Sequence, residues 1–168
     1  MTVHVRSAAR ADAGLILDFI KELAAYEKLT GEVVATEARL AESLFGPGAT
    51  AEVLIAEVAG NPAAFALFFH NYSTFVARPG IYLEDLFVRP EFRNRGIGHA
   101  LLARIADLAR ERKCGRLEWS VLDWNAPAID FYRSLGAVPM AEWTTFRLTG
   151  AKLNNLADLA LPASGDGA

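Results

Sequence analysis

The sequence has few residues that could form covalent or metal-based cross-links. It contains one cysteine, Cys114, in 168 residues, which excludes an intrachain disulfide. No group of His and Cys residues has the spacing of metal ligands, so we expect no structural zinc. These shortages fit the reducing environment of the cytosol, and we predict a cytoplasmic protein that holds no metal.

Long hydrophobic runs are also missing. The longest apolar stretch, residues 61–70, is too short to span a bilayer, and residues 1–14 lack the apolar core of a signal peptide. We therefore expect neither secretion nor a membrane partner. The chain is nevertheless 52% hydrophobic, and we predict a single domain over residues 1–150. Residues 151–168 form a C-terminal tail, and we expect its last residues to be disordered.

Charge of one sign is not in large excess, because the net charge is only −3. This balance argues against general binding of nucleic acids. One segment, residues 89–116, is basic, with 8 basic and 3 acidic residues. A single localised anionic ligand explains this pattern better than a long polyanion does.

Hydrophobic periodicity predicts alternating α and β elements without internal repeats. The expected strands come first at hairpin spacing and later alternate with helices. We predict an α/β fold with a mixed central sheet, antiparallel at its N-terminal strands, with a parallel step across a long helix and further helices flanking it. The expected strands are residues 4–8, 51–59, 63–71, 80–88, 115–122 and 143–148, and the expected helices are residues 11–29, 36–46, 95–113 and 125–136.

Two glycines, Gly96 and Gly98, stand where the basic segment enters the long helix. Glycine lets the backbone approach a ligand closely, and the first turn of a helix offers unpaired N–H groups to a phosphate. The stretch lacks both the P-loop pattern and the third glycine of a dinucleotide-binding loop. The alternative is a tight strand-to-helix turn with solvated arginines.

The stretch RNRGIG, from Arg93 to Gly98, resembles the R/Q-x-x-G-x-G/A motif of the GNAT acetyltransferase superfamily. The blocks IKELAAYEKL, YLEDLFV and WNAPAIDFYRSLGA resemble, in order and spacing, its diamine (spermidine/spermine) and thialysine acetyltransferase branch. The resemblance implies acetyl transfer from acetyl-CoA to a primary amine of a small cationic substrate, by direct attack in a ternary complex. It also implies a homodimer.

The resemblance implies a coenzyme site in which backbone N–H groups of the loop hold the pyrophosphate and the end of strand 80–88 binds the pantetheine. Asn125 has a second possible role as a plain helix N-cap, and Arg133 as a solvated helix residue. His99 would line the phosphate site without taking part in the chemistry. The coenzyme-binding candidates are Leu86, Phe87, Val88, Arg93, Asn94, Arg95, Gly96, Ile97, Gly98, His99, Asn125, Ala128 and Arg133.

Two candidates for catalysis follow from the chemistry of acetyl transfer. An alkylammonium with a pKa of ~10.4 must lose its proton before it can attack, and the resemblance assigns this relay to Glu84, directly or through water. The departing thiolate needs a proton, and the phenol of Tyr132, with an ordinary pKa of ~10, is the candidate general acid. The alternatives are a solvated Glu84 and a core role for the Tyr132 ring.

The amine itself is expected in an acidic, partly aromatic pocket. On a regular strand, Glu84 and Asp85 would point to opposite faces. Phe75 stands where many polyamine acetyltransferases carry a tryptophan, which leaves thialysine, lysine-like amines and other small diamines open. The substrate-binding candidates are Tyr26, Glu27, Glu84, Asp85, Glu118 and Trp119.

Two other functions stay open at the level of sequence. One is a non-catalytic acyl-CoA-binding sensor, and the other is an acetyltransferase that acts on a protein or another amine. A sensor would need only the RNRGIG loop, whereas the chain also has Glu84 and Tyr132. Their presence favours the enzyme.

Overall fold

The computed structural model describes residues 2–158. The chain divides into two compact units, Met1–Val121 and Leu122–Ala168, and each is described here by itself. Within the described residues no helix is both long and apolar enough to cross a membrane.

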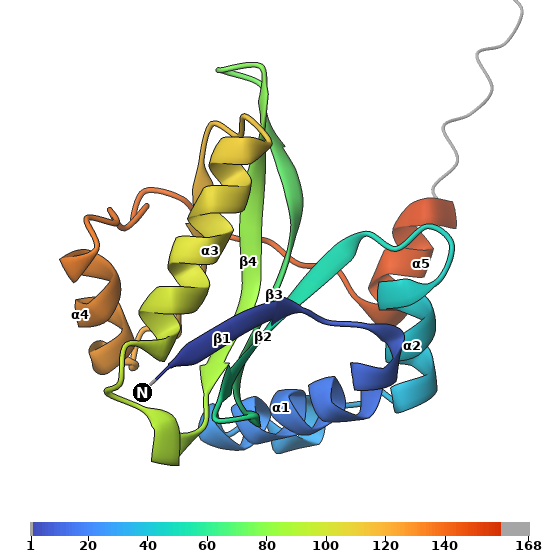
Figure 1. Ribbon diagram of the computed structural model, residues 1–168. Coiled ribbons are helices and arrows are strands. Elements are labelled where there is room, and N and C mark those ends of the chain that lie inside the picture. The colour runs from blue at the N-terminus through green and yellow to red at the C-terminus, as the bar shows by residue number, and fades with distance from the viewer. Residues whose placement is uncertain (1, 159–168) are drawn as a thin grey trace, which may run out of the picture. The chain divides into compact units, whose positions relative to one another are not determined.

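The first unit is built on a five-stranded sheet with the strand order β1-β2-β3-β4-β5 (Figure 1). The pairs β1·β2, β2·β3 and β3·β4 are antiparallel, and β4·β5 is parallel. This topology confirms the mixed sheet predicted from the sequence. The strands are β1 (Val3–Ser7), β2 (Ala51–Val58), β3 (Asn61–Ser73), β4 (Arg78–Val88) and β5 (Leu117–Trp119).

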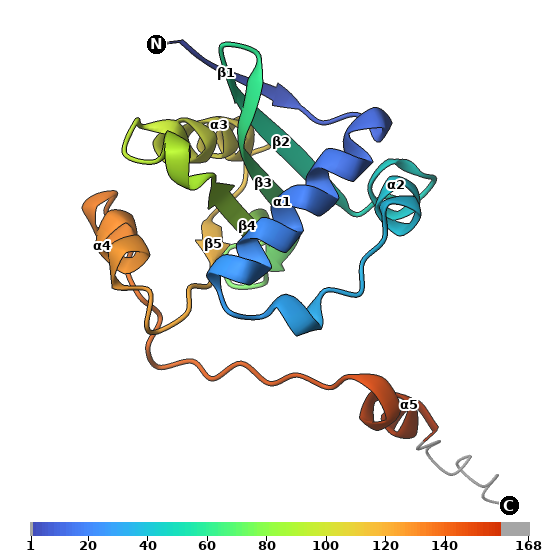
Figure 2. The same ribbon diagram turned by 90° about the horizontal axis from the view of Figure 1, so that it is seen from below.

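Helices cover both faces of this sheet, and Figure 2 shows α1 and α3 on opposite sides of the strands. Three short 3-10 turns, η1 (Arg10–Asp12), η2 (Thr30–Glu32) and η3 (Pro90–Phe92), connect the elements. The helix α3 is the parallel crossover between β4 and β5. The helices of this unit are α1 (Ala13–Tyr26), α2 (Glu37–Phe45) and α3 (Ile97–Glu111).

The core has two layers because alternate strand residues face opposite sides of the sheet. On the α1 side, the rings of Phe19 and Phe65 stack with centroids 5.2 Å apart, and both side chains are fully buried. On α3, Leu101 and Ile105 are fully buried as well. Aromatic pairs of this kind add to the free energy that apolar burial supplies.

Local signals set the ends of these elements as expected. The hydroxyl of Thr36 accepts a hydrogen bond from the backbone N–H of Arg39 at 3.3 Å, so the predicted N-cap of α2 is confirmed. Between β2 and β3, Ala59 and Gly60 both have positive φ, at 51° and 77°. Two such residues are typical of the tight turn that joins hairpin strands.

Two predicted strands differ from the structure. β5 covers only Leu117–Trp119 because its parallel partner β4 has an extra residue just beyond the paired stretch, which breaks the regular ladder. Residues 143–148 are not a strand, and the side chains of Trp143 and Phe146 are exposed. An extended segment becomes a strand only when a neighbour pairs with its backbone, and no strand of the described range does so here.

The second unit contains α4 (Ala126–Ser134) and α5 (Gly150–Asp158). α4 confirms the predicted helix, and Gly136 follows it with a φ of 86°, the left-handed conformation expected just beyond a helix end. α5 was not predicted. The predicted disorder of the last tail residues lies outside the described residues.

Candidate functional site

The central feature of the candidate site is a bulge in β4 at Glu84. In the antiparallel pairing with β3, Leu83 lies opposite Phe68 and Asp85 lies opposite Leu67, which leaves Glu84 as the extra residue. A bulge turns the following side chains relative to the regular alternation. Glu84 and Asp85 therefore do not point to opposite faces as they would on a regular strand, and both line the same pocket.

This pocket has a volume of about 420 Å³ and lies between the end of α1, the η2 segment and β4. Its charged residues are all acidic: Glu27, Glu32, Glu84 and Asp85. Its walls are apolar, and consist of Ile20, Leu23, Ala24, Leu29, Val33, Val34 and Ala35. We call this the acidic pocket.

The four carboxylates of the acidic pocket form no salt bridge with any residue in the described range. The pKa of Asp85 is raised to about 6, mainly by burial and further by the neighbouring charges of Glu84 and Glu27. Burial also raises the pKa of Glu27. A cation in the pocket would relieve the mutual repulsion of these groups.

β4 and β5 separate at the bulge. Their parallel pairing ends at Leu83 and Trp119, while β4 continues to Val88. On its other edge, β4 stays paired with β3, where Leu86 lies opposite Ala66. The backbone of β4 beyond Glu84 therefore has one edge that β5 does not cover, and backbone N–H groups on such an edge can stabilise developing negative charge.

The glycine loop has the geometry of an anion site at the start of α3. Asn94 and Gly96 are both left-handed, with φ of 58° and 75°, and Gly96 is the N-cap of the helix. Successive N–H groups in such a turn can point toward one anion, and the first N–H groups of a helix have no partner within it. A Cβ added at Gly96 would meet no atom within 4 Å, so open space lies beside the loop.

The side chains of this loop differ in their surroundings. His99 and Arg95 are exposed, and Ile97 is buried in the core. Arg93, by contrast, turns back into the protein: its Nε donates to the carbonyl of Val88 at 3.0 Å, and its guanidinium carbon lies 4.6 Å from the centre of the Tyr26 ring.

The second unit carries the remaining candidates on or beside α4. The side chain of Asn125 is buried and accepts a hydrogen bond from the N–H of Ala128 at 3.4 Å, which makes it the N-cap of the helix. The ring of Tyr132 is half-buried and lies at a tilt to that of Phe131, with centroids 5.5 Å apart. Arg133 is exposed in the last turn.

Three of the substrate-binding candidates do not line the acidic pocket. Tyr26 packs against the hydrophobic core beneath Arg93. Glu118, on β5, accepts a hydrogen bond from Asn71 and forms a salt bridge with Arg116, both at 2.8 Å, and Trp119 follows it in the strand. The carboxylate of Glu118 is thus already neutralised by protein groups.

Glu32 and the apolar wall of the pocket were not predicted from the sequence. Part of the wall was detectable, because Ile20, Leu23, Ala24 and Glu27 follow the spacing of one helix face. Glu32 was not, because it lies in the η2 turn, where no periodicity predicts the direction of a side chain.

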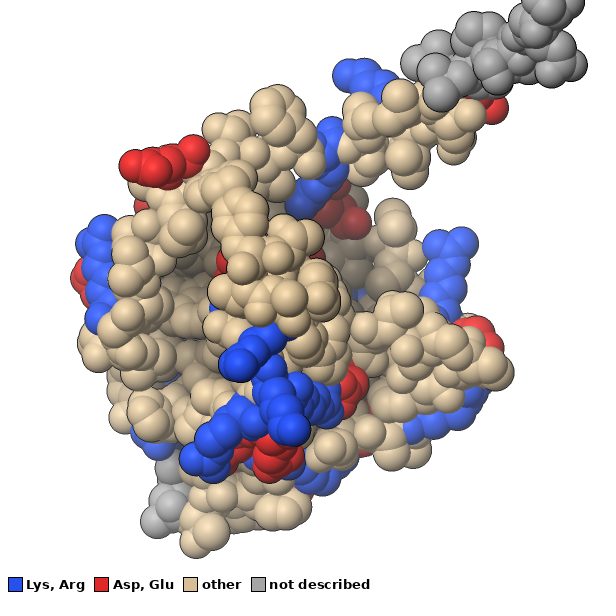
Figure 3. Space-filling model, turned by 90° about the horizontal axis from the view of Figure 1, so that it is seen from above, with Lys and Arg blue, Asp and Glu red and all other residues tan. Residues whose placement is uncertain are grey.

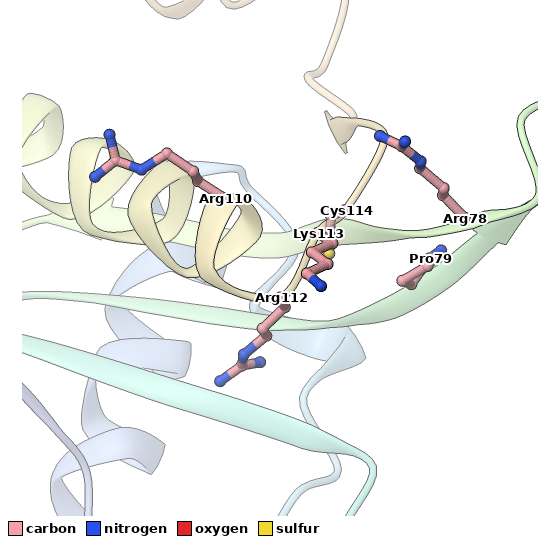
Figure 4. Close-up of a pocket in the computed structure, with 6 residues that line it drawn as sticks. All are labelled: Arg78, Pro79, Arg110, Arg112, Lys113 and Cys114. Atoms are coloured by element: carbon pink, nitrogen blue, oxygen red, sulfur yellow. The ribbon is translucent and has the colours of Figure 1, made fainter.

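A second hollow of about 550 Å³ lies at the other end of α3 and is basic. Figure 3 shows Lys and Arg side chains gathered on one face with acidic side chains among them, and Figure 4 shows the lining residues pointing in different directions. Arg112 forms a salt bridge with Glu52, and Arg110 forms one with Asp107 at 2.7 Å. These side chains do not converge on one point, so this hollow is not the candidate site.

Within residues 2–158, no group of three or more His, Cys, Asp or Glu side chains is placed to hold a metal ion.

Comparisons with known proteins give the sequences and the fold that this chain resembles. The sequence model of the Acetyltransferase (GNAT) family matches residues 20–137. A thialysine N-epsilon-acetyltransferase of Bos taurus is 38% identical, over 92% of this chain and 97% of its own length. An L-ornithine N5-acetyltransferase of Arabidopsis thaliana is 33% identical, over 91% and 87%. An integron cassette protein of V. cholerae superposes with a TM-score of 0.79 at 28% identity, over 94% and 98%.

Proposed function

Because this chain belongs to the acetyltransferase (GNAT) family, we propose that it transfers the acetyl group of acetyl-CoA to a primary amine of a small, cationic, aliphatic substrate. The observation that carries the substrate class is the acidic pocket, with its four carboxylates and its apolar walls. Carboxylates attract ammonium groups, and the walls suit the methylene chain between them. The named relatives act on thialysine and ornithine, which are amines of this kind.

The coenzyme site fits the same proposal. The left-handed residues Asn94 and Gly96, the unpaired N–H groups at the start of α3 and the open space beside Gly96 suit a pyrophosphate. The uncovered edge of β4 from Leu86 to Val88 suits the pantetheine. Acetyl-CoA, when bound, supplies the acetyl thioester.

The first step is removal of a proton from the ammonium. Glu84 is exposed at the bulge and opens onto the acidic pocket, so it can take the proton directly or through water. Asp85 and Glu27 hold the cation nearby. The neutral amine then attacks the thioester carbonyl, and backbone N–H groups of β4 stabilise the negative charge on its oxygen.

The last step is protonation of the leaving thiolate. Tyr132 is our candidate donor, on the chemistry of its phenol and its place in the WNAPAIDFYRSLGA block. The acetyl–nitrogen bond forms first, and the acetyl–sulfur bond breaks when the tetrahedral intermediate collapses. The ammonium proton leaves on Glu84 and passes to solvent, the thiolate gains a proton from Tyr132, and the second proton that the nitrogen loses after attack restores the phenol of Tyr132.

The test is release of free thiol from acetyl-CoA by the purified protein, with the product mass checked. The substrates are spermidine, putrescine, thialysine, ornithine, lysine, small neutral amino acids and aminoglycosides. We expect turnover on the aliphatic di- and polycations or on the basic amino acids, and none on the neutral amino acids. Binding of acetyl-CoA without turnover on any of these amines would contradict the proposal and favour a sensor or a protein substrate.

A further inference from the structure

The guanidinium of Arg93 does not extend into the open space beside the glycine loop. Its Nε donates to the carbonyl of Val88 at 3.0 Å, and its guanidinium carbon lies over the ring of Tyr26, 4.6 Å from the ring centre. The ring of Phe87 is 5.6 Å from the same carbon. Contacts between a guanidinium and an aromatic face are strongest when both are partly shielded from water, as these half-buried side chains are.

A second arginine, Arg89, four residues before Arg93, also turns back against the protein. Arg89 donates to both carboxylate oxygens of Glu22, at 2.7 to 3.2 Å, and to the carbonyl of Pro62 at 2.9 Å. Its guanidinium carbon lies 4.6 Å from the centre of the Phe19 ring. Such a two-pronged ion pair is geometrically specific.

These two contacts fasten the segment after β4 to one face of α1. Glu22 and Tyr26 are four residues apart, so they lie one turn apart on the same face of the helix. Arg89 and Arg93 are also four residues apart and bracket η3. Figure 1 shows this segment beside α1.

The residues next to the contact between Arg93 and Tyr26 belong to the acidic pocket and to the glycine loop. On α1, Tyr26 is followed directly by Glu27, which lines the acidic pocket. After η3, Arg93 is followed directly by the left-handed Asn94 of the glycine loop. The contact between Arg93 and Tyr26 therefore connects the residue before the loop with the residue before Glu27.

We propose that Arg93 is a positioning residue for the acidic pocket and is not a ligand of the coenzyme phosphates. Through Tyr26, it holds the end of α1, and hence Glu27, in place. This inference rests on the proposed function. It assigns the phosphate side-chain contact to the exposed Arg95 instead.

The first experiment compares two acetyl donors in Arg93→Gln and its matched control Arg95→Gln. One donor is acetyl-CoA, and the other is S-acetyl-N-acetylcysteamine, a thioester without phosphates. We expect Arg93→Gln to raise the amine KM about tenfold with both donors. Arg95→Gln should raise the KM for acetyl-CoA, and this effect should vanish with the phosphate-free donor.

The second experiment asks whether Arg93 acts through Tyr26. Tyr26→Leu removes the ring, Tyr26→Phe keeps it, and Arg93→Lys keeps a cation above it. If the contact carries the effect, Arg93→Gln combined with Tyr26→Leu should be little worse than either change alone, because both remove one interaction. Arg93→Gln should still raise the amine KM in the Tyr26→Phe background, which keeps the ring, and Arg93→Lys should recover part of the loss.

The third experiment does not depend on turnover. Calorimetry should give Arg93→Gln a Kd for coenzyme A within about twofold of wild type, while hydrogen exchange becomes faster at the end of α1. A tenfold weaker Kd for coenzyme A, or unchanged exchange in α1, would overturn the role of Arg93. Lack of turnover by the wild-type protein would overturn the proposed function alone, since these two measurements would still decide about Arg93.

Discussion

Glu84 and Asp85 are adjacent in β4 and line the same pocket, although neighbours on a regular strand point to opposite faces. The bulge at Glu84 is the cause. It also marks the point where β5 stops following β4, so one irregularity both gathers the carboxylates and uncovers the backbone edge beside them.

Glu84→Gln should keep the shape of this side chain and remove its ability to take a proton. We expect kcat/KM at neutral pH to fall about 10²- to 10⁴-fold, and part of the loss to be recovered at high pH, where more of the amine is already neutral. Steady-state rates from pH 6 to 10 measure this. An unchanged rate at pH 7 would assign the proton transfer to another group.

Glu32→Gln should affect binding of the amine and leave the chemical step nearly unchanged. Loss of one solvent-exposed charge at the pocket corresponds to a rise of about three- to tenfold in the amine KM, with kcat little altered. The effect should be larger for a dication than for a monoamine of similar length. Equal effects on the two amines would place Glu32 outside the binding region.

Asp85→Asn should stabilise the fold at neutral pH. The carboxyl pKa is about 6 in the folded protein and 3.8 ordinarily, so the folded state holds its proton to higher pH than the unfolded state does. Stability is therefore unaffected by this group below about pH 4 and falls as the pH rises through 6. We expect Asp85→Asn to raise Tm by roughly 2–4 °C at pH 7.5 and to change it little at pH 4.

The matched control for Asp85 is Glu57→Gln, because the hydrogen bond from Arg6 lowers the pKa of Glu57. Here the sign is opposite: the paired carboxylate stabilises the fold at neutral pH, and this contribution is lost as the pH falls through its pKa. Glu57→Gln should lower Tm at pH 7.5. Thermal unfolding of both variants at the two pH values measures this. A shift of Tm in the same direction for the two variants would contradict this account.

Gly96→Ala tests whether the left-handed turn of the glycine loop matters for the binding of acetyl-CoA. A Cβ would meet no atom within 4 Å, so the cost is the left-handed φ of 75°, about 1–2 kcal/mol. Gly60→Ala is the control, since Gly60 has a φ of 77° and equally open surroundings in a hairpin. Both should lose similar stability, and Gly96→Ala alone should raise the KM for acetyl-CoA.

Tyr132→Phe should slow turnover without weakening the binding of coenzyme A. Removing the phenolic proton donor is expected to lower kcat about 10²-fold or more while the Kd for coenzyme A stays near wild type. Tyr72→Phe, at an exposed tyrosine of β3, is the control and should leave both quantities unchanged. A normal kcat for Tyr132→Phe would mean that another group or water protonates the thiolate.

The sequence by itself determined the architecture of the sheet and its helices. The apolar run from Val53 to Ala56, the helical spacing of α1 and α3, and the caps at Thr36 and Asn125 are all local signals in the chain, and these predictions were confirmed. The predicted strand at residues 143–148 was wrong because residues that favour strands do not by themselves supply a partner for the backbone.

The sequence also identified the carboxylates and the glycine loop, but it did not show which of these groups lie together in the folded protein. Only the tertiary structure decided that Glu32 joins Glu27, Glu84 and Asp85, and that Glu118 is instead neutralised by Arg116 and hydrogen-bonded to Asn71. The direction of a side chain at a bulge or in a turn depends on register and on packing against distant elements. Those are long-range properties, and local periodicity does not contain them.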